Sequence, residues 1–247
     1  MLPQIYQVYW RGDPSEVAEF SSWYMGKHAA ELIDDVGFWG VHHYRSLHGR
    51  AQASNIYEIP GIELFTRRSY DQIHQDDEYT AHGHWGSQQE QNQAKDLRGA
   101  PGSRQTIYDV IASIGIIDHT KGEPARPVME GAIVSPVVST IRFGAASDKA
   151  VIAWYEEAET ERLLKIEGFV KSRLGRRAAQ QHPEPTHPHE ERAYVVITEW
   201  THHGAAAAEG DEHALTERLA AALDLEGELE VDVFRQQMSL LHPDVWR

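Results

Sequence analysis

The feature that most limits how this chain can fold is a repeat within its own sequence. Residues 23–38 read WYMGKHAAELIDDVGF, and residues 154–169 read WYEEAETERLLKIEGF. Without any gap, five positions match: Trp23 with Trp154, Tyr24 with Tyr155, Leu32 with Leu163, Gly37 with Gly168, and Phe38 with Phe169. The spacing is about half the chain, so it predicts a duplicated domain rather than a solenoid of short repeats.

Each copy divides into the same series of expected elements. In the first copy, the run Asp13-Pro14-Ser15-Glu16 supplies a helix N-cap with proline at the first helical position, and Gly37 supplies a C-cap. The strands expected in the first copy are residues 4–11, 38–46, 53–59 and 105–114, with helices at 14–35 and 64–79. The strands expected in the second copy are residues 133–143, 169–178, 193–201 and 229–237, with helices at 147–166 and 212–223.

The order βαββαβ in each copy is that of the ferredoxin-like unit, which predicts an α+β fold. Such a unit places both helices on one face of an antiparallel sheet and leaves the other face bare. Two copies can bury their bare faces against each other. We therefore expect a first repeat at 1–118, a Pro/Gly-containing linker at 119–130 and a second repeat at 131–247.

The WY…H…L…GF helix between two strands resembles the dimeric α/β barrel superfamily, and in particular its EthD-like branch, here as a fused tandem. The resemblance covers nearly the whole chain. It implies two sheets facing each other as a dimeric α/β barrel. Members of this superfamily include cofactor-free monooxygenases, muconolactone isomerases, polyketide cyclases, dehydratases and haem enzymes. A shared fold does not choose among these activities.

Composition excludes several other classes of protein. The formal net charge of −15 argues against nucleic-acid binding, which needs clustered Lys and Arg. The chain has no cysteine, which removes disulfides and cysteine-ligated metals. No apolar run approaches the roughly 20 residues of a membrane span, and no signal peptide is evident, so a cytoplasmic location is expected.

The first candidate catalytic residue is His28. On a helix it lies one turn after Tyr24 and one turn before Leu32, on the same stripe. The second copy has Glu159 at the equivalent position, so the two halves are expected to have separate roles. The EthD-like resemblance implies that His28 lines a pocket. The alternative is a partly buried structural histidine.

The second strand supplies the next candidates. Side chains alternate along a strand, so His42 and Tyr44 share one face and His43 lies on the other. By comparison with the second copy, we expect His42, Tyr44 and Arg173 to point into the barrel. An imidazole, a phenol and a guanidinium could act there as an acid–base and oxyanion set. Asp109 on the fourth strand, aligned with Asp232, could orient a histidine or pair with Arg173.

Further candidates for substrate binding lie in the first copy. Tyr9 supplies aromatic surface on the first strand. The long loop after the second helix carries His82, His84 and Trp85, and it resembles a lid more than a metal site because no third ligand is evident. If chemistry occurs, we expect a cavity centred on the first repeat and closed by this loop.

These residues favour a cofactor-independent enzyme that acts on a small aromatic or polyketide-like molecule by histidine acid–base proton transfer, of the lyase, isomerase, dehydratase or cyclase type. The alternatives are a cofactor-free monooxygenase or haem-binding enzyme of the same superfamily, or a non-catalytic small-molecule-binding protein. We expect no metal and no organic cofactor. The expected partner is a small-molecule substrate, with neither nucleic acid nor membrane, and two copies of the chain could form a homodimer.

Overall fold

The computed structural model describes residues 3–12, 14–67, 69, 103–115, 131–183, 188–207 and 211–245. The eight strands close into one antiparallel barrel in the order β1-β3-β2-β8-β5-β7-β6-β4. The strands are β1 (Gln4–Trp10), β2 (Gly40–His48), β3 (Ala53–Ile59), β4 (Arg104–Ile114), β5 (Val137–Ala145), β6 (Phe169–Arg177), β7 (Tyr194–Trp200) and β8 (Leu225–Leu241).

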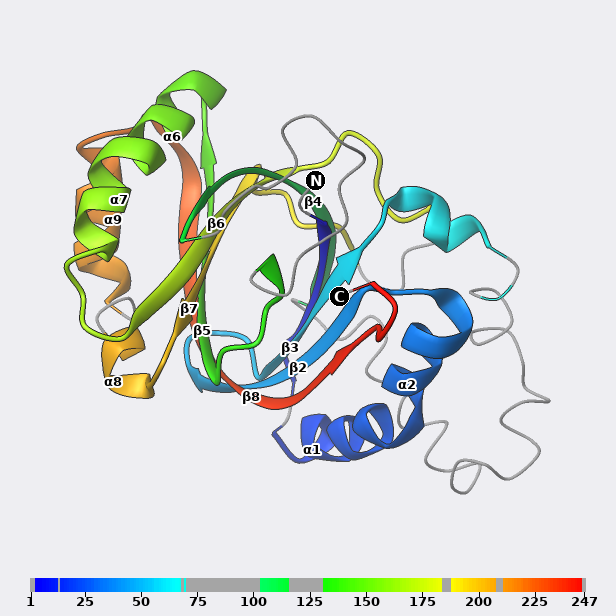
Figure 1. Ribbon diagram of the computed structural model, residues 1–247. Coiled ribbons are helices and arrows are strands. Elements are labelled where there is room, and N and C mark those ends of the chain that lie inside the picture. Colours follow the sequence, from blue (N-terminus) through cyan, green and yellow to red (C-terminus); the bar gives the residue numbers. More distant parts are fainter. Residues whose placement is uncertain are drawn as a thin grey trace.

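Helices cover the outside of the barrel on two opposite sides (Figure 1). In the first half of the chain they are α1 (Pro14–Trp23), η1 (Tyr24–His28), α2 (Ala29–Glu31), η2 (Leu32–Val36) and η3 (Ile62–Thr66). In the second half they are α6 (Asp148–Trp154), η5 (Tyr155–Glu159), α7 (Thr160–Leu163), α8 (His203–Ala206) and α9 (Glu212–Ala220). No helix within the described ranges has both the length and the apolar character needed to cross a membrane.

The strand order is the same in both halves: β4-β1-β3-β2 in the first and β8-β5-β7-β6 in the second. The two four-stranded sheets meet edge to edge through β2 with β8 and β4 with β6, so the barrel has no free edge. The antiparallel α+β barrel agrees with the fold expected from the sequence. The expected linker, residues 119–130, lies outside the described residues.

The matched segments of the repeat fold alike. Each begins a π-helical turn at its tyrosine, Tyr24 or Tyr155, and each has a glycine with positive φ shortly before the next strand. Gly37 has φ 91° and Gly168 has φ 89°, a region that glycine enters at little cost. Gly37 is the C-cap of the first helix, whereas the second helix ends at Leu163 and Gly168 lies in the turn before β6.

Two expected elements differ from the structure. Strand β5 begins at Val137 rather than at residue 133, because Pro136 has no N–H to donate to a neighbouring strand. Strand β8 runs from Leu225 to Leu241, longer than the expected 229–237, because it pairs with both β5 and β2. Most of the expected helix at residues 64–79 lies outside the described residues.

Apolar side chains gather in three layers. One lies between the first-half helices and the sheet, a second between the second-half helices and the sheet, and a third fills part of the barrel interior. Alternation along each strand decides which layer a side chain joins. Val41 packs under the first-half helices, whereas Tyr44 packs inside the barrel.

Candidate functional site

The layer beneath the first-half helices contains a buried polar chain of three side chains. The His43 Nδ1 lies 2.6 Å from the Asn55 Oδ1, and the Asn55 Nδ2 donates to the Tyr57 hydroxyl at 2.8 Å. Because Asn55 presents its carbonyl oxygen to His43, the proton of the ring is held on Nδ1 and the lone pair lies on Nε2. Burial lowers the pKa of His43 from 6.5 to about 4, so the ring is neutral at pH 7.

Two residues of the helix lie beside this chain. The ring centroid of Tyr24 is 5.3 Å from that of His43 and 5.6 Å from that of His28. His28 is half-buried, with Nδ1 3.9 Å from a carboxylate oxygen of Glu31. Both belong to η1, and π-helical turns of this kind occur often at functional sites. We call His28, Tyr24, His43, Asn55 and Tyr57 the first-half polar layer.

The second half has an apolar counterpart at the same place. His43 pairs with Asn55 across β2 and β3, and the corresponding pair across β6 and β7 is Leu174 with Val196. Both of these residues belong to the second-half apolar core. An uncompensated buried polar group destabilises a fold, so a polar pair at a site that an aliphatic pair can fill points to a role other than packing.

Glu159, the counterpart of His28, has a different environment. It is buried, and its carboxylate is bound by Arg162, whose Nη2 lies 2.6 Å from Oε1, with Arg218 at 3.7 Å. The negative charge of Glu159 is therefore compensated by arginines of the second-half helices. The two halves differ at this position, as the sequence predicts.

The barrel interior contains the other expected catalytic residues. His42, Tyr44 and Arg173 all point inward, as strand alternation predicts, and all are buried. The His42 Nε2 lies 2.9 Å from Glu58, and its Nδ1 lies 2.8 Å from the Ser239 hydroxyl. His42 is therefore held by a carboxylate on one side and a hydroxyl on the other.

Residues 131–135, the plug segment, occupy this end of the barrel interior, and Figure 1 shows the chain leading into β5 within the ring of strands. Charged side chains of the wall hold its backbone through the following hydrogen bonds: Lys171 to the Ala132 carbonyl at 2.5 Å, Arg173 to the Gly131 carbonyl at 2.5 Å, the Ile133 N–H to Glu58 at 3.2 Å, and the Val134 and Ser135 N–H groups to Glu199 at 3.1 Å. The plug segment fills space that the sequence reading assigned to a substrate.

Arg173 is correspondingly committed to a partner. Its Nη1 donates to Glu199 at 2.7 Å. Burial alone would raise the pKa of Glu199, but Arg173 and Lys171 outweigh it and hold that pKa below its ordinary value. Arg173 is thus bound to a buried carboxylate and to a backbone carbonyl of the plug segment, and its expected role in holding a substrate anion stays a prediction.

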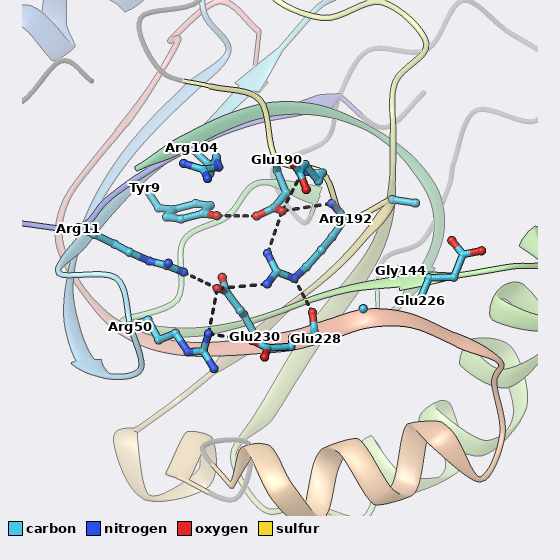
Figure 2. Close-up of a pocket in the computed structure, with 13 residues that line it drawn as sticks. Tyr9, Arg11, Arg50, Arg104, Gly144, Glu190, Arg192, Glu226, Glu228 and Glu230 are labelled. Atoms are coloured by element: carbon cyan, nitrogen blue, oxygen red, sulfur yellow. Dashed lines mark hydrogen bonds and ion pairs between the residues drawn. The ribbon is translucent and has the colours of Figure 1, made fainter. Parts of the chain in front are cut away.

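Tyr9 lines a cavity of about 430 Å³ at the other end of the barrel (Figure 2). Its hydroxyl donates to Glu190 at 2.5 Å, and the guanidinium of Arg142 lies 4.1 Å from its ring centroid. Burial is the main cause that raises the pKa of Tyr9, so its hydroxyl stays protonated. The expected role of Tyr9 as a lining residue agrees with this position.

The structure separates residues that the sequence reading brought together. His28 lies on the helix side of the sheet, whereas His42 and Tyr44 lie on the barrel side, so the three do not share one cavity. Asp109 also lies away from His42 and Arg173. Because Tyr108 occupies the inward position of β4, its neighbour Asp109 faces outward and accepts a hydrogen bond from Gln4 at 2.7 Å.

The remaining expected binding residues, His82, His84 and Trp85, lie outside the described residues. Within the described part of the chain, no group of three or more His, Asp or Glu side chains is arranged to hold a metal ion.

Sequence reasoning missed His43, Asn55 and Tyr57. A signal was present, because His43 aligns with Leu174 on the strand face that packs under the helices. A histidine at a position where the second copy has leucine is a departure from the apolar pattern. Only the pairing of β2 with β3 brings Asn55 beside it.

No protein-family model matches the chain, and no curated protein matches its sequence. Among solved structures, an anthrone oxidase-like protein superposes with a TM-score of 0.63 at 12% identity, covering 98% of this chain and 94% of the other. A chlorite dismutase-like protein gives a TM-score of 0.53 at 12% identity, covering 96% of each chain. A monooxygenase-like protein from Lactobacillus acidophilus gives 0.51 at 9% identity, covering 98% of this chain and 97% of the other.

Identities this low establish a shared fold alone. The fold is that of the ferredoxin-like dimeric α/β barrel, which is the fold that the resemblance drawn from the sequence implies.

Proposed function

We propose that the protein is an enzyme that oxidises a small phenolic compound with molecular oxygen, in the first-half polar layer and without a metal or organic cofactor. The observation that carries the proposal is His43. It is a buried neutral imidazole whose Nδ1 is bound to Asn55, and its Nε2 has no hydrogen-bond partner among the described residues. Such a nitrogen can accept a proton from a bound ligand, or a hydrogen bond from a hydroxyl group of that ligand.

The surrounding groups suit a hydroxylated aromatic ring. Tyr24 and Tyr57 supply aromatic surface in this layer: the ring centroid of Tyr24 is 5.3 Å from that of His43 and 6.5 Å from that of Tyr57. The Asn55 amide fixes the orientation of the imidazole. His28, on the same helix turn as Tyr24, supplies a second imidazole at the edge of the layer. Its predicted role as a pocket-lining residue is kept in this proposal.

In the proposed reaction, His43 Nε2 takes a proton from an activated C–H or O–H group of the substrate. The resulting anion gives electrons to O₂. For a methylene carbon next to the aromatic rings, the balance is CH₂ plus O₂ giving C=O plus H₂O. One oxygen atom enters the carbonyl and the other leaves as water, with the proton on His43 returned to it.

The names of the solved neighbours favour this oxygenase class over the lyase or isomerase class expected first. One is anthrone oxidase-like and another is monooxygenase-like, and anthrones carry the activated methylene group that this reaction needs. We further propose that residues 1–118 and 131–247 are the two repeats of a duplicated domain, and that two copies of the chain can assemble as a dimer.

The test is oxygen uptake by the purified protein with a hydroxylated anthrone as probe, together with the absorbance of the quinone that forms. The wild-type protein should accelerate both signals. His43→Leu combined with Asn55→Val copies the pair found in the second half, so the variant should fold. It should lower turnover by about 10²–10⁴-fold, the usual contribution of a general base.

His213→Ala is the matched control, because that histidine is exposed on α9 and far from the layer. It should keep full turnover. Full activity in the Leu/Val variant, with a native circular dichroism spectrum, would show that His43 is not the base. An absorbance scan of the wild-type protein serves as a second control, because a strong haem band in active fractions would replace the cofactor-free reading with a haem-dependent one.

A further inference from the structure

A second site lies at the open end of the barrel, on the opposite side of the sheet from the first-half polar layer. The cavity there, of about 430 Å³, draws residues from both halves of the chain and is drawn in Figure 2. Cavities of this size hold small organic ligands. Its lining includes Tyr9, four arginines and several glutamates.

The inner carboxylates of this cavity already have cationic partners. Glu230 lies 2.5 Å from Arg11 and 3.2 Å from Arg192. Glu190 lies 2.9 Å from Arg192 and also accepts the Tyr9 hydroxyl. These pairs hold the pKa values of both glutamates below their ordinary range despite burial, so both are ionised. Beneath them, Arg142 is buried against Asp232 and Glu230.

Arg104 differs from these arginines in its hydrogen-bond and ion-pair partners. It lines the same cavity and is half-buried, and Figure 2 shows it beside the ring of Tyr9. Its hydrogen bond goes to a backbone carbonyl, that of Ser103, at 2.8 Å. Among the described residues it forms no ion pair. Its guanidinium therefore faces the cavity with donors to spare.

The charge count of the inner wall follows from these contacts. On the inner side of the cavity, three lining arginines face two buried carboxylates, which leaves one positive charge: Arg11, Arg104 and Arg192 against Glu190 and Glu230. Arg142 and Asp232 lie beneath this lining and pair with each other. Arg50 is engaged with Glu212 and Glu228 at the rim. The rim glutamates are exposed, so water and salt screen their charge.

We propose that this cavity binds a small organic monoanion, whose carboxylate pairs with Arg104 and whose apolar part lies against Tyr9. An arginine fork matches a carboxylate with two parallel hydrogen bonds, and a half-buried position strengthens that pair. The site is separate from the layer that carries the proposed oxidation. The proposal of an anion site therefore does not depend on the proposed oxidation.

The probe is benzoate, with neutral benzamide as its uncharged isostere, titrated by calorimetry at low ionic strength. Benzoate should bind, benzamide should not, and added salt should weaken the binding. Arg104→Gln should weaken benzoate binding at least tenfold, and Arg104→Lys should retain part of it. Arg176→Gln is the control, because that exposed arginine pairs with Asp148 outside the cavity.

The His43→Leu/Asn55→Val variant should bind benzoate as well as the wild type, which keeps this site distinct from the oxidation site. Absence of benzoate binding by the wild type would overturn the proposal. Equal binding of benzamide, or full benzoate affinity in a natively folded Arg104→Gln variant, would do the same.

Discussion

At the scale of single residues, His43 shows how burial sets the state of a side chain. Its ring is enclosed between the helix and the sheet, and among the described residues its hydrogen-bond partner is the neutral amide of Asn55. The nearby Arg45 guanidinium adds to the effect of burial, because it disfavours a second positive charge. The imidazole is thus kept neutral well below its ordinary pKa, and the lone pair on its Nε2 faces no partner among the described residues.

This burial predicts a specific pH dependence of stability. The pKa of His43 falls from 6.5 in the unfolded chain to about 4 in the folded protein. Between those values the unfolded chain binds a proton that the folded protein does not, so the free energy of unfolding should fall as the pH drops through this window. The loss should total about 3 kcal/mol and should level off below about pH 4.

Urea denaturation of the wild type and of His43→Leu/Asn55→Val across this range measures the effect. Other titrating groups contribute equally to both proteins, so the difference between the two curves isolates His43. The wild type should lose more stability than the variant on acidification, and above about pH 6.5 the difference should be constant. Parallel curves at every pH would show that His43 titrates normally.

At the scale of elements, the plug segment is held by charge rather than by apolar contact. Glu199 accepts two backbone N–H groups of residues 131–135 and also pairs with Arg173 and Lys171. Glu58 accepts a third N–H while it holds His42. The buried carboxylate of Glu199 thus binds both the plug segment and the barrel wall, and its removal leaves Arg173 without a carboxylate partner.

Glu199→Gln should therefore destabilise the protein by about 3–5 kcal/mol, because it leaves the charge of Arg173 buried and unpaired. Glu161→Gln removes an exposed carboxylate that pairs with Lys165 one helical turn away, and it should cause no measurable change. Urea denaturation at pH 7 gives both values. A loss in Glu199→Gln no larger than that in Glu161→Gln would mean that the plug segment does not depend on this carboxylate.

At the scale of the whole molecule, the barrel closes only because each half supplies the edges that the other half lacks. Strand β2 pairs with β8, and β4 pairs with β6, so both junctions join one half to the other. Arg142 reaches from β5 to Asp232 on β8 and stacks on Tyr9 of the first half. Neither half buries its inner sheet face without the other.

The two halves should therefore stay together when the chain between them is cut. A protease site placed in residues 119–130 and cleaved should leave a complex that elutes at the size of the intact protein and unfolds in one transition. The two strand junctions and the shared interior hold the fragments in place. Elution of separate half-size fragments in native buffer would show that the linker, rather than the barrel, keeps the halves together.

The sequence by itself determined the features that depend on short-range geometry. The repeated Trp-Tyr…Gly-Phe pattern located one helix in each half and the glycine that caps the first of them, and alternation along a strand placed His42, Tyr44 and Arg173 inside the barrel. These features follow from backbone geometry within one element, which a local pattern reports.

The tertiary structure decided which groups meet. His42 binds Ser239 and Glu58, Arg173 binds Glu199, and His43 finds Asn55, because strands far apart in the sequence lie in a particular register. The same register turned Asp109 outward, brought the plug segment into the interior and gathered Arg104 with Tyr9 at the open end. A pattern read along one strand contains no information on the register between strands. The side-chain partners in these sites could therefore be identified only from the closed barrel.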